Sequence, residues 1–228
     1  MKETKEKSPS LFEKKTFRDV HRHGIMVQWI RKEWDKMDIL NLIKKNRSYR
    51  KFDESKPVTQ EDLERFVNCA RFTAASVNLQ PLRYYLSAKA ETNSLIFKHT
   101  KWARLLKDYE GPAEGERPTG YIVVVEDKQV AANADRFLVD VGIVSQSILL
   151  AAVEAGFGGI MIRNFVPAEL ARDLGLSDRY VPMMILAVGA PAEQIVLEEI
   201  DEGQPTAYYR DENGIHHVPK RKLNDIIL

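Results

Sequence analysis

The stretch Tyr121-Ile122-Val123-Val124-Val125 (YIVVV) is apolar at every position. A strand with one face in water alternates apolar and polar residues, whereas a strand covered on both faces is apolar throughout. The stretch therefore predicts the central strand of a sheet. Segment 208–218 is predicted as a hairpin, because Asn213-Gly214 favours a two-residue turn. Further strands are predicted at 84–88, 160–162 and 183–188.

Helical patterns surround the predicted sheet. Segment 133–155 carries two adjacent apolar stripes, which predicts a helix buried on most sides or at a subunit interface. Thr59 followed by Asp62 resembles a capping box, so a second helix is expected to begin there. A short helix is expected after Asp38 and another over 167–174. Mixed strands and helices without internal repeats predict one domain of the α/β or α+β class.

The composition limits the classes of function. The 228 residues include 34 Lys+Arg and 33 Asp+Glu, a net charge of +1, so no global field favours nucleic acid. Cys69 is the single cysteine, which suits a reducing cytoplasm and leaves no zinc spacing. The longest apolar runs are too interrupted to span a membrane. We expect a cytoplasmic protein with neither a membrane nor a nucleic-acid partner.

The first 36 residues differ from the remainder. They are charged, poor in branched aliphatic side chains and weakly periodic, which is typical of a flexible extension. Met37 stands directly before the first clear helical pattern, so the compact domain is expected at 37–228. The sequence leaves open whether the extension is a tail, a vector remnant or an upstream start.

Several chemistries have no matching motif. The G-F-G-G stretch at 156–159 follows a helix and precedes a strand, the reverse of a dinucleotide fingerprint. We therefore expect Gly156 to stop the helix and Gly158 to form a turn. His216 and His217 are adjacent and point to opposite faces of a strand, so they cannot bind one metal from one side. Neither a metal centre nor nucleophilic catalysis is expected.

A basic stretch, KKNRSYRKF at 44–52, places five cations and a hydroxyl in nine residues. Cations are favoured at a helix C-terminus, so a solvated helix end explains its two leading lysines. It does not explain Ser48 between Arg47 and Arg50, where two guanidinium groups and a hydroxyl can converge on one phosphate. On this stretch alone, the solvated helix end is the favoured interpretation.

Two other stretches change that balance. In AASVNLQP at 74–81, Asn78 and Gln80 precede a proline, which fits a rigid loop that presents amides to a heterocycle. The alternative is a loop whose amides satisfy its own backbone. A second basic cluster, VPKRK at 218–222, is by itself a solvated tail.

Together these stretches resemble the FMN-dependent nitroreductase family. Its members typically carry an R-R-S-x-R-x-F pattern, a P-S-x-x-N-x-Q-P-W loop, a long central helix ending in glycines and a basic C-terminal stretch. The resemblance implies an α+β nitroreductase-like fold, with a central mixed sheet flanked by helices in an interlocked homodimer. It also implies an NAD(P)H-dependent flavin oxidoreductase that uses FMN to reduce nitroaromatics, quinones or similar conjugated acceptors in a ping-pong cycle.

The resemblance assigns FMN binding to four groups of residues: Arg47, Ser48 and Arg50; Asn78 and Gln80; Met161 and Ile162; and Lys220 and Arg221. The first group would hold the phosphate and ribityl chain, and the last group would return to the phosphate. The amides would lie beside the pyrimidine edge or the neighbouring subunit, and the backbone of the third group would face the flavin near N5 and O4. We expect alanine in place of both arginines of the first group to abolish FMN retention while the fold is preserved.

Four positions depart from the family pattern. Asn46 stands where the first arginine is common, which we expect to weaken phosphate affinity. Ala74 and Ala75 replace Pro-Ser, and Leu82 replaces Trp, so the flavin contacts of that loop are altered.

Other functions remain open at this point. A different flavin enzyme on the same scaffold, such as a reductive dehalogenase or a flavin-consuming enzyme, fits the same motifs. So does a flavin-binding or redox-sensing protein without significant turnover. A nucleic-acid role for the basic segments would require strongly salt-dependent binding. Segment 97–112, with Trp102, Arg104 and Tyr109, is either a mobile wall over an acceptor pocket or an ordinary surface helix and loop.

Overall fold

The structure is a computed structural model that describes residues 38–103, 105–106, 109–131 and 134–228. The predictions for residues 1–36 and for Arg104 lie outside the described residues. The chain divides into two units, Met1–Ile39 and Leu40–Leu228, and the second contains both sheets. Within the described ranges, every helix is too short or too polar to cross a membrane.

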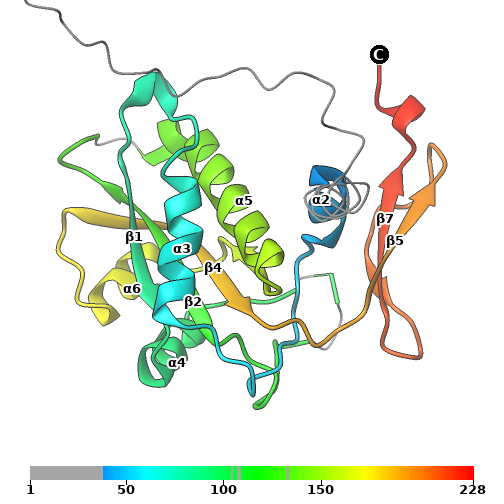
Figure 1. The fold of residues 1–228 in the computed structure, drawn as a ribbon, viewed down its shortest axis with the longest axis horizontal. Helices are drawn as coiled ribbons and strands as arrows, with labels where there is room; N and C mark the ends of the chain where they lie inside the picture. Colours follow the sequence, from blue (N-terminus) through cyan, green and yellow to red (C-terminus); the bar gives the residue numbers. More distant parts are fainter. Residues whose placement is uncertain (1–37, 104, 107–108, 132–133) are drawn as a thin grey trace, which may run out of the picture. The chain divides into compact units, whose positions relative to one another are not determined.

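A four-stranded sheet forms the centre of the second unit (Figure 1). Its strands, in spatial order, are β1 (Leu82–Ser87), β2 (Gly120–Asp127), β4 (Tyr180–Gly189) and β3 (Gly158–Ile162). All three neighbouring pairs are antiparallel. Every residue of β2 is buried, so the apolar YIVVV stretch is the central strand that it predicts.

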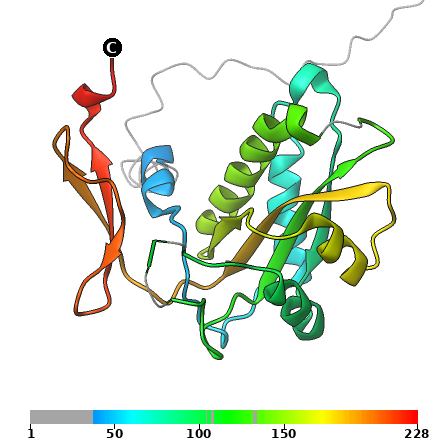
Figure 2. The same cartoon turned by 180° about the vertical axis from the view of Figure 1, so that it is seen from behind.

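Helices cover both faces of this sheet, as Figures 1 and 2 show from opposite sides. They are α3 (Gln60–Ala70), α4 (Ala90–Lys98), α5 (Leu138–Glu154) and α6 (Pro167–Asp173). Ile122 and Val124 of β2 pack in the core that includes α3 and α5. Val123 and Val125 pack in the core that includes Ile96 of α4 and Leu170 of α6. The two-residue period of a strand thus divides the stretch between two layers.

The predicted helices are present. Thr59 Oγ1 accepts the Asp62 N–H at 3.1 Å, and Asp62 Oδ2 accepts the Thr59 N–H at 3.1 Å, which completes the capping box of α3. Helix α5 begins at Leu138, later than predicted, because a 3₁₀ turn, Ala134–Phe137, precedes it. A short helix, α2 (Ile39–Lys45), comes directly before the basic stretch.

The C-terminal part forms a second sheet of three strands. These are β5 (Ile195–Ile200), β7 (His216–Arg221) and β6 (Tyr209–Arg210), in that spatial order. This second sheet is the mixed one. Strands β5 and β7 pair in parallel, whereas β6 and β7 are antiparallel. The α+β class is confirmed. Strand β5 was not predicted.

The β6–β7 hairpin is confirmed, but its predicted two-residue turn is wrong. The connection runs from Asp211 to Ile215, and Gly214 adopts a φ of 77° within it. The Asp211 carboxylate accepts the N–H groups of Asn213 and Ile215 at 3.0 and 2.8 Å. A side chain that bonds the nearby backbone can replace the hydrogen bonds of a tight turn. Here the Asp211 carboxylate does so and stabilises a loop longer than the predicted two residues.

Gly158 was predicted as a turn and instead lies in β3, opposite Gly189. The pair Gly158-Gly159 gives the basic stretch room to approach the sheet. Ser48 forms a parallel bridge with Gly159, and the Tyr49 N–H donates to the Gly159 carbonyl at 3.2 Å. Gly156 stops α5 with a φ of 85°, as predicted. The glycines therefore join the end of α5 to the basic stretch.

Gly159→Ala is expected to lower the free energy of unfolding by about 1–3 kcal/mol, the usual range for overpacking. A Cβ there would lie 2.5 Å from the Ala187 carbonyl oxygen and 2.7 Å from Leu149 Cδ2. Chemical denaturation measures the change. The matched control is Gly142→Ala on α5, where a Cβ meets nothing within 4 Å and should raise stability by about 0.5–1 kcal/mol. Equal stability of the two variants would contradict the tight approach.

Candidate functional site

The basic stretch and the second sheet enclose a cavity of about 220 Å³, called the basic cavity below. Its lining comprises Asn46, Arg47, Ser48, Arg50, Ile195, Tyr208, His216, Val218 and Lys220. Four of the predicted site residues thus meet here, although Lys220 is distant from the other three in sequence. Cations and a hydroxyl around so small a space can bind an oxyanion of phosphate type by charge-assisted hydrogen bonds.

Arg50 is held rigidly at this cavity and is only 5% exposed. Its Nη1 donates to the Ser48 carbonyl at 2.9 Å and lies 3.2 Å from His216 Nε2. Its guanidinium lies over the Tyr208 ring, 4.7 Å from the centroid. Its buried Nε has no hydrogen-bond partner among the described residues. An oxyanion in the cavity would satisfy such a donor.

Arg47 combines the two roles considered for the basic stretch. Its Nη2 donates to the Ile43 carbonyl at the end of α2, at 2.8 Å, as a helix-end cation does. Its Nε is buried and also has no partner within the described part of the chain. Burial lowers the pKa of this guanidinium, a sign that it is short of compensating negative charge. One side chain thus closes the helix and lines the cavity.

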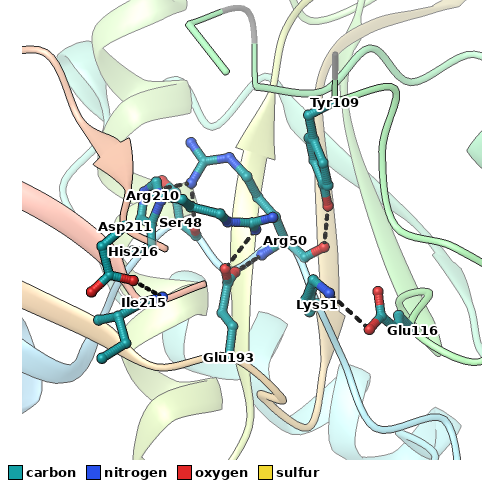
Figure 3. A network of polar contacts seen from close by, with 10 residues as sticks. All are labelled: Ser48, Arg50, Lys51, Tyr109, Glu116, Glu193, Arg210, Asp211, Ile215 and His216. Carbon is teal, nitrogen blue, oxygen red and sulfur yellow. Dashed lines mark hydrogen bonds and ion pairs between the residues drawn. The ribbon is translucent and has the colours of Figure 1, made fainter. Parts of the chain in front are cut away.

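Glu193 ties the backbone of Arg50 to the second sheet (Figure 3). Its side chain is 3% exposed, and it accepts the Arg50 backbone N–H and, at 2.9 Å, Arg210 Nη2. The Arg50 carbonyl accepts the Tyr109 hydroxyl at 2.7 Å. The Arg210 guanidinium lies over the Tyr109 ring, 4.8 Å from the centroid. Arg50 is therefore anchored on both its N–H and its C=O.

The segment around Trp102 and Tyr109 is anchored where it is described. Trp102 is buried in the core shared with α4 and α6, and its Nε1 donates to Thr100 Oγ1 at 2.8 Å. Tyr109 belongs to the Glu193 network. Lys51 of the basic stretch forms an ion pair with Glu116 at 2.9 Å and does not line the basic cavity.

Asn78 and Gln80 lie elsewhere, on the exposed loop between α3 and β1. Neither lines the basic cavity, and Gln80 Nε2 donates to Asn78 Oδ1 at 3.1 Å. Val77, Asn78 and Gln80 have φ values of 47°, 54° and 52°, which L-residues rarely adopt. Buried Asp140 holds the loop by accepting Ser76 N–H and Oγ–H at 2.9 and 2.6 Å. The loop therefore projects its amides in a fixed conformation.

The other predicted residues differ in how they meet the cavity. Met161 and Ile162 follow Gly159 on β3, and the Ile162 side chain is in the core. Lys220 lines the cavity, whereas Arg221 is exposed and does not. His216, Val218 and Lys220 occupy alternate positions of β7, so Arg221 falls on the other face of the strand.

Asn46, which departs from the family pattern, is buried at the cavity. Its Nδ2 donates to Gln146 Oε1 on α5 at 3.3 Å. The amide thus packs against α5 where the pattern has a cation. The sequence reasoning missed Glu193, which belongs to no local motif, and considered His216 only as a metal ligand. The alternation of β7 from Lys220 back to His216 was a usable signal for the latter.

The two adjacent histidines sit in opposite environments. His216 is 1% exposed, and burial, together with the charges of Arg50 and Arg210, lowers its pKa to about 4. His217 bonds Glu198 Oε1 through Nδ1 at 2.5 Å, and this hydrogen bond raises its pKa. At neutral pH, His216 is therefore the uncharged member of a cationic cluster.

Because of His216, the free energy of unfolding is expected to decrease as the pH is lowered. Between its unfolded pKa of 6.5 and its folded pKa of about 4, only the unfolded state takes up the proton. At about 1.4 kcal/mol per pH unit, this lowers the free energy of unfolding by about 3 kcal/mol as the pH falls through that window. His217 contributes with the opposite sign, as its folded pKa is raised.

Urea denaturation of the wild type and of His216→Gln at pH 7 and pH 4 isolates this contribution. The carboxylates and His217 are common to both proteins and cancel in the comparison. The wild type should lose about 3 kcal/mol more than the variant. The same pH dependence in both proteins would mean that His216 is not buried as a neutral ring.

The fold is thus an antiparallel sheet covered by helices on both faces, and the basic stretch that lines the cavity pairs with the glycine-rich edge strand β3. The chain belongs to the nitroreductase family, because the sequence model of that family, described as "Nitroreductase family", matches residues 43–190. The match contains the basic stretch, the glycine pair and the central sheet. It ends before Glu193 and the whole second sheet.

Among curated proteins, the chain is 26% identical over 191 residues to a Bacillus subtilis (strain 168) protein provisionally named NAD(P)H nitroreductase YdgI, covering 69% of this chain and 90% of that protein. A nitroreductase family protein from Streptococcus pneumoniae TIGR4 has a TM-score of 0.60 at 18% identity, covering 84% of this chain and 99% of that one. A structure from Exiguobacterium sibiricum 255-15, described as a nitroreductase in complex with FMN, has a TM-score of 0.60 at 21% identity, covering 84% and 97%. The structural likenesses show a shared fold.

Proposed function

We propose that the chain is an FMN-dependent oxidoreductase that passes electrons from NADH or NADPH to nitroaromatic, quinone or similar conjugated acceptors by a ping-pong mechanism. The observation that carries the proposal is the basic cavity. There, Arg47, Arg50 and Lys220 surround about 220 Å³, and two buried guanidinium N–H groups have no partner among the described residues. The family and the FMN-bound Exiguobacterium structure support it.

The cavity suits the phosphate end of FMN. Arg47, Ser48, Arg50 and Lys220 would hold the phosphate, and the β3 backbone at Met161 and Ile162 would face the ring system. Arg221, on the other face of β7, is left as a weaker candidate. When bound, FMN supplies the hydride transfer between a nicotinamide and an acceptor. The chain's own contribution is to bind and orient this group; no side chain is assigned as a general acid or base.

The rigid anchoring of Arg50 fits this role. Glu193 and Tyr109 fix its backbone, and Tyr208 and the Ser48 carbonyl fix its guanidinium. A cation that is positioned before its anion arrives loses little conformational freedom on binding. The site is therefore preorganised for a dianionic group.

A homodimer would complete the site in this proposal. The loop that carries Asn78 and Gln80 does not line the basic cavity of its own chain, and Asp140 holds the loop through Ser76. Val77 on this loop and Val139 on α5 are largely exposed apolar side chains. A second chain that covers them would receive the amides beside its own flavin.

Steady-state kinetics test the proposal. The FMN-loaded protein should oxidise NADH or NADPH in the presence of a nitroaromatic or a quinone. Double-reciprocal plots at several acceptor concentrations should be parallel, as in a ping-pong cycle. Intersecting lines would contradict the mechanism. Bound FMN without NAD(P)H oxidation by any acceptor would instead identify a flavin-binding protein without turnover.

A further inference from the structure

His216 is a buried part of the basic cavity that the family match does not reach. It begins β7, outside the matched residues 43–190, and it shares the cavity face of that strand with Val218 and Lys220. Its ring lies 5.2 Å from the Tyr208 ring, centroid to centroid. Tyr208 also covers the Arg50 guanidinium, so the three side chains form one packed group.

Arg50 fixes the tautomer of this histidine. His216 Nε2 lies 3.2 Å from Arg50 Nη1, and a guanidinium nitrogen can only donate. Nε2 must therefore be the acceptor, which places the ring proton on Nδ1 in a neutral imidazole. The charges around the ring oppose a second proton: Arg50 contacts it, and Arg210 and His217 lie close by, with Glu193 shared by the two arginines. The ring thus offers one N–H, at Nδ1.

That N–H has no acceptor among the residues that the structure describes. His216 Nδ1 is buried and unpaired, as are the Nε atoms of Arg47 and Arg50. Buried N–H groups in native proteins almost always find a partner. Three unsatisfied donors on side chains that line one cavity of about 220 Å³ call for a ligand with several acceptor oxygens.

We propose that His216, as a neutral imidazole, donates its Nδ1–H to a phosphate oxygen of FMN in the basic cavity and so contributes to the preference for FMN over riboflavin. The inference rests on the proposed function. It adds a recognition residue from the second sheet, and it gives Arg50 a second role as the group that orients the ring.

Two substitutions separate the two nitrogens of the ring. In His216→Gln, the side-chain amide can reach the Nε2 position and accept from Arg50, but the donor at Nδ1 is lost. In His216→Asn, the shorter amide can place a donor near Nδ1. The affinities of the full chain, freed of flavin, for FMN and for riboflavin are measured by quenching of flavin fluorescence. Riboflavin lacks the phosphate and serves as the internal control.

The wild type should bind FMN more tightly than riboflavin. His216→Gln should lower the ratio of the two affinities about tenfold or more, the usual effect of losing a hydrogen bond to a charged group. His216→Asn should keep most of the ratio. An unchanged ratio in His216→Gln overturns the inference, and so does an equal loss of both affinities, because either result means a purely structural role. A wild type without flavin affinity overturns the proposed function and the inference with it.

Nitrogen-15 NMR of the ring gives a readout that does not depend on activity. His216 should be protonated at Nδ1 in the flavin-free protein, and FMN should shift the Nδ1 proton downfield while riboflavin should not. His217, on the other face of β7, is the internal reference. An Nε2-protonated ring, or equal responses to FMN and riboflavin, would refute the assignment.

Discussion

Replacing Glu193 with Gln is expected to lower the free energy of unfolding by about 3–5 kcal/mol, the usual loss when one partner of a buried ion pair is removed. The carboxylate is buried between the Arg50 backbone N–H and the Arg210 guanidinium. Gln can still accept one hydrogen bond, but it leaves the partly exposed Arg210 without its counter-charge beside the buried Arg50. Urea denaturation followed by far-UV circular dichroism measures the loss.

The same substitution is expected to abolish FMN retention, because His216 and Lys220 reach the cavity from β7, and Tyr208 directly precedes β6. The matched control is Glu199→Gln, an exposed carboxylate on β5, which should change stability by no more than about 0.5 kcal/mol. If both variants lose the same stability, Glu193 does not anchor the second sheet.

Arg47→Ala is expected to weaken FMN binding by about 10–100-fold while the protein stays folded. A hydrogen bond to a charged group contributes enough for a loss of this size. The flavin-free protein should lose only about 1 kcal/mol, for the bond to the Ile43 carbonyl. Equilibrium titration with FMN and denaturation of the same sample give both values.

Arg47 is a better test than Arg50. The Arg50 side chain is buried and contacts Ser48, His216 and the Tyr208 ring, so its removal also damages the fold. We therefore expect alanine at both positions to lower the stability of the fold as well as FMN retention. Lys45→Ala is the control for Arg47, as this exposed cation lies two residues away and does not line the cavity. Equal loss of FMN affinity in the two variants would mean that Arg47 acts only through its positive charge and not as a ligand of the phosphate.

The parts of the fold that depend on local pattern were predictable. The apolar YIVVV stretch gave a strand buried on both faces, and Thr59 with Asp62 gave a capped helix. Strand β5 was missed because its sequence, IVLEEI, is half-buried and has no clear alternation. Gly158 was misassigned because a glycine required for close approach of a distant segment resembles a glycine in a turn.

The residues of the candidate site likewise divide into those that a local pattern predicts and those that it does not. Arg47, Ser48 and Arg50 are neighbours in sequence, so their convergence was visible before the structure. Glu193 and His216 contact Arg50 across 143 and 166 residues, and each is a single polar residue outside any motif. Their role arises from the packing of the second sheet against the basic stretch, which a local pattern does not encode.

The visible absorbance spectrum tests the central claim most directly. The purified full chain is incubated with excess FMN, separated from free flavin by gel filtration and then scanned. The account predicts flavin absorbance bands that correspond to FMN in an amount equimolar with the chain. A folded protein that emerges colourless and takes up no FMN would contradict it.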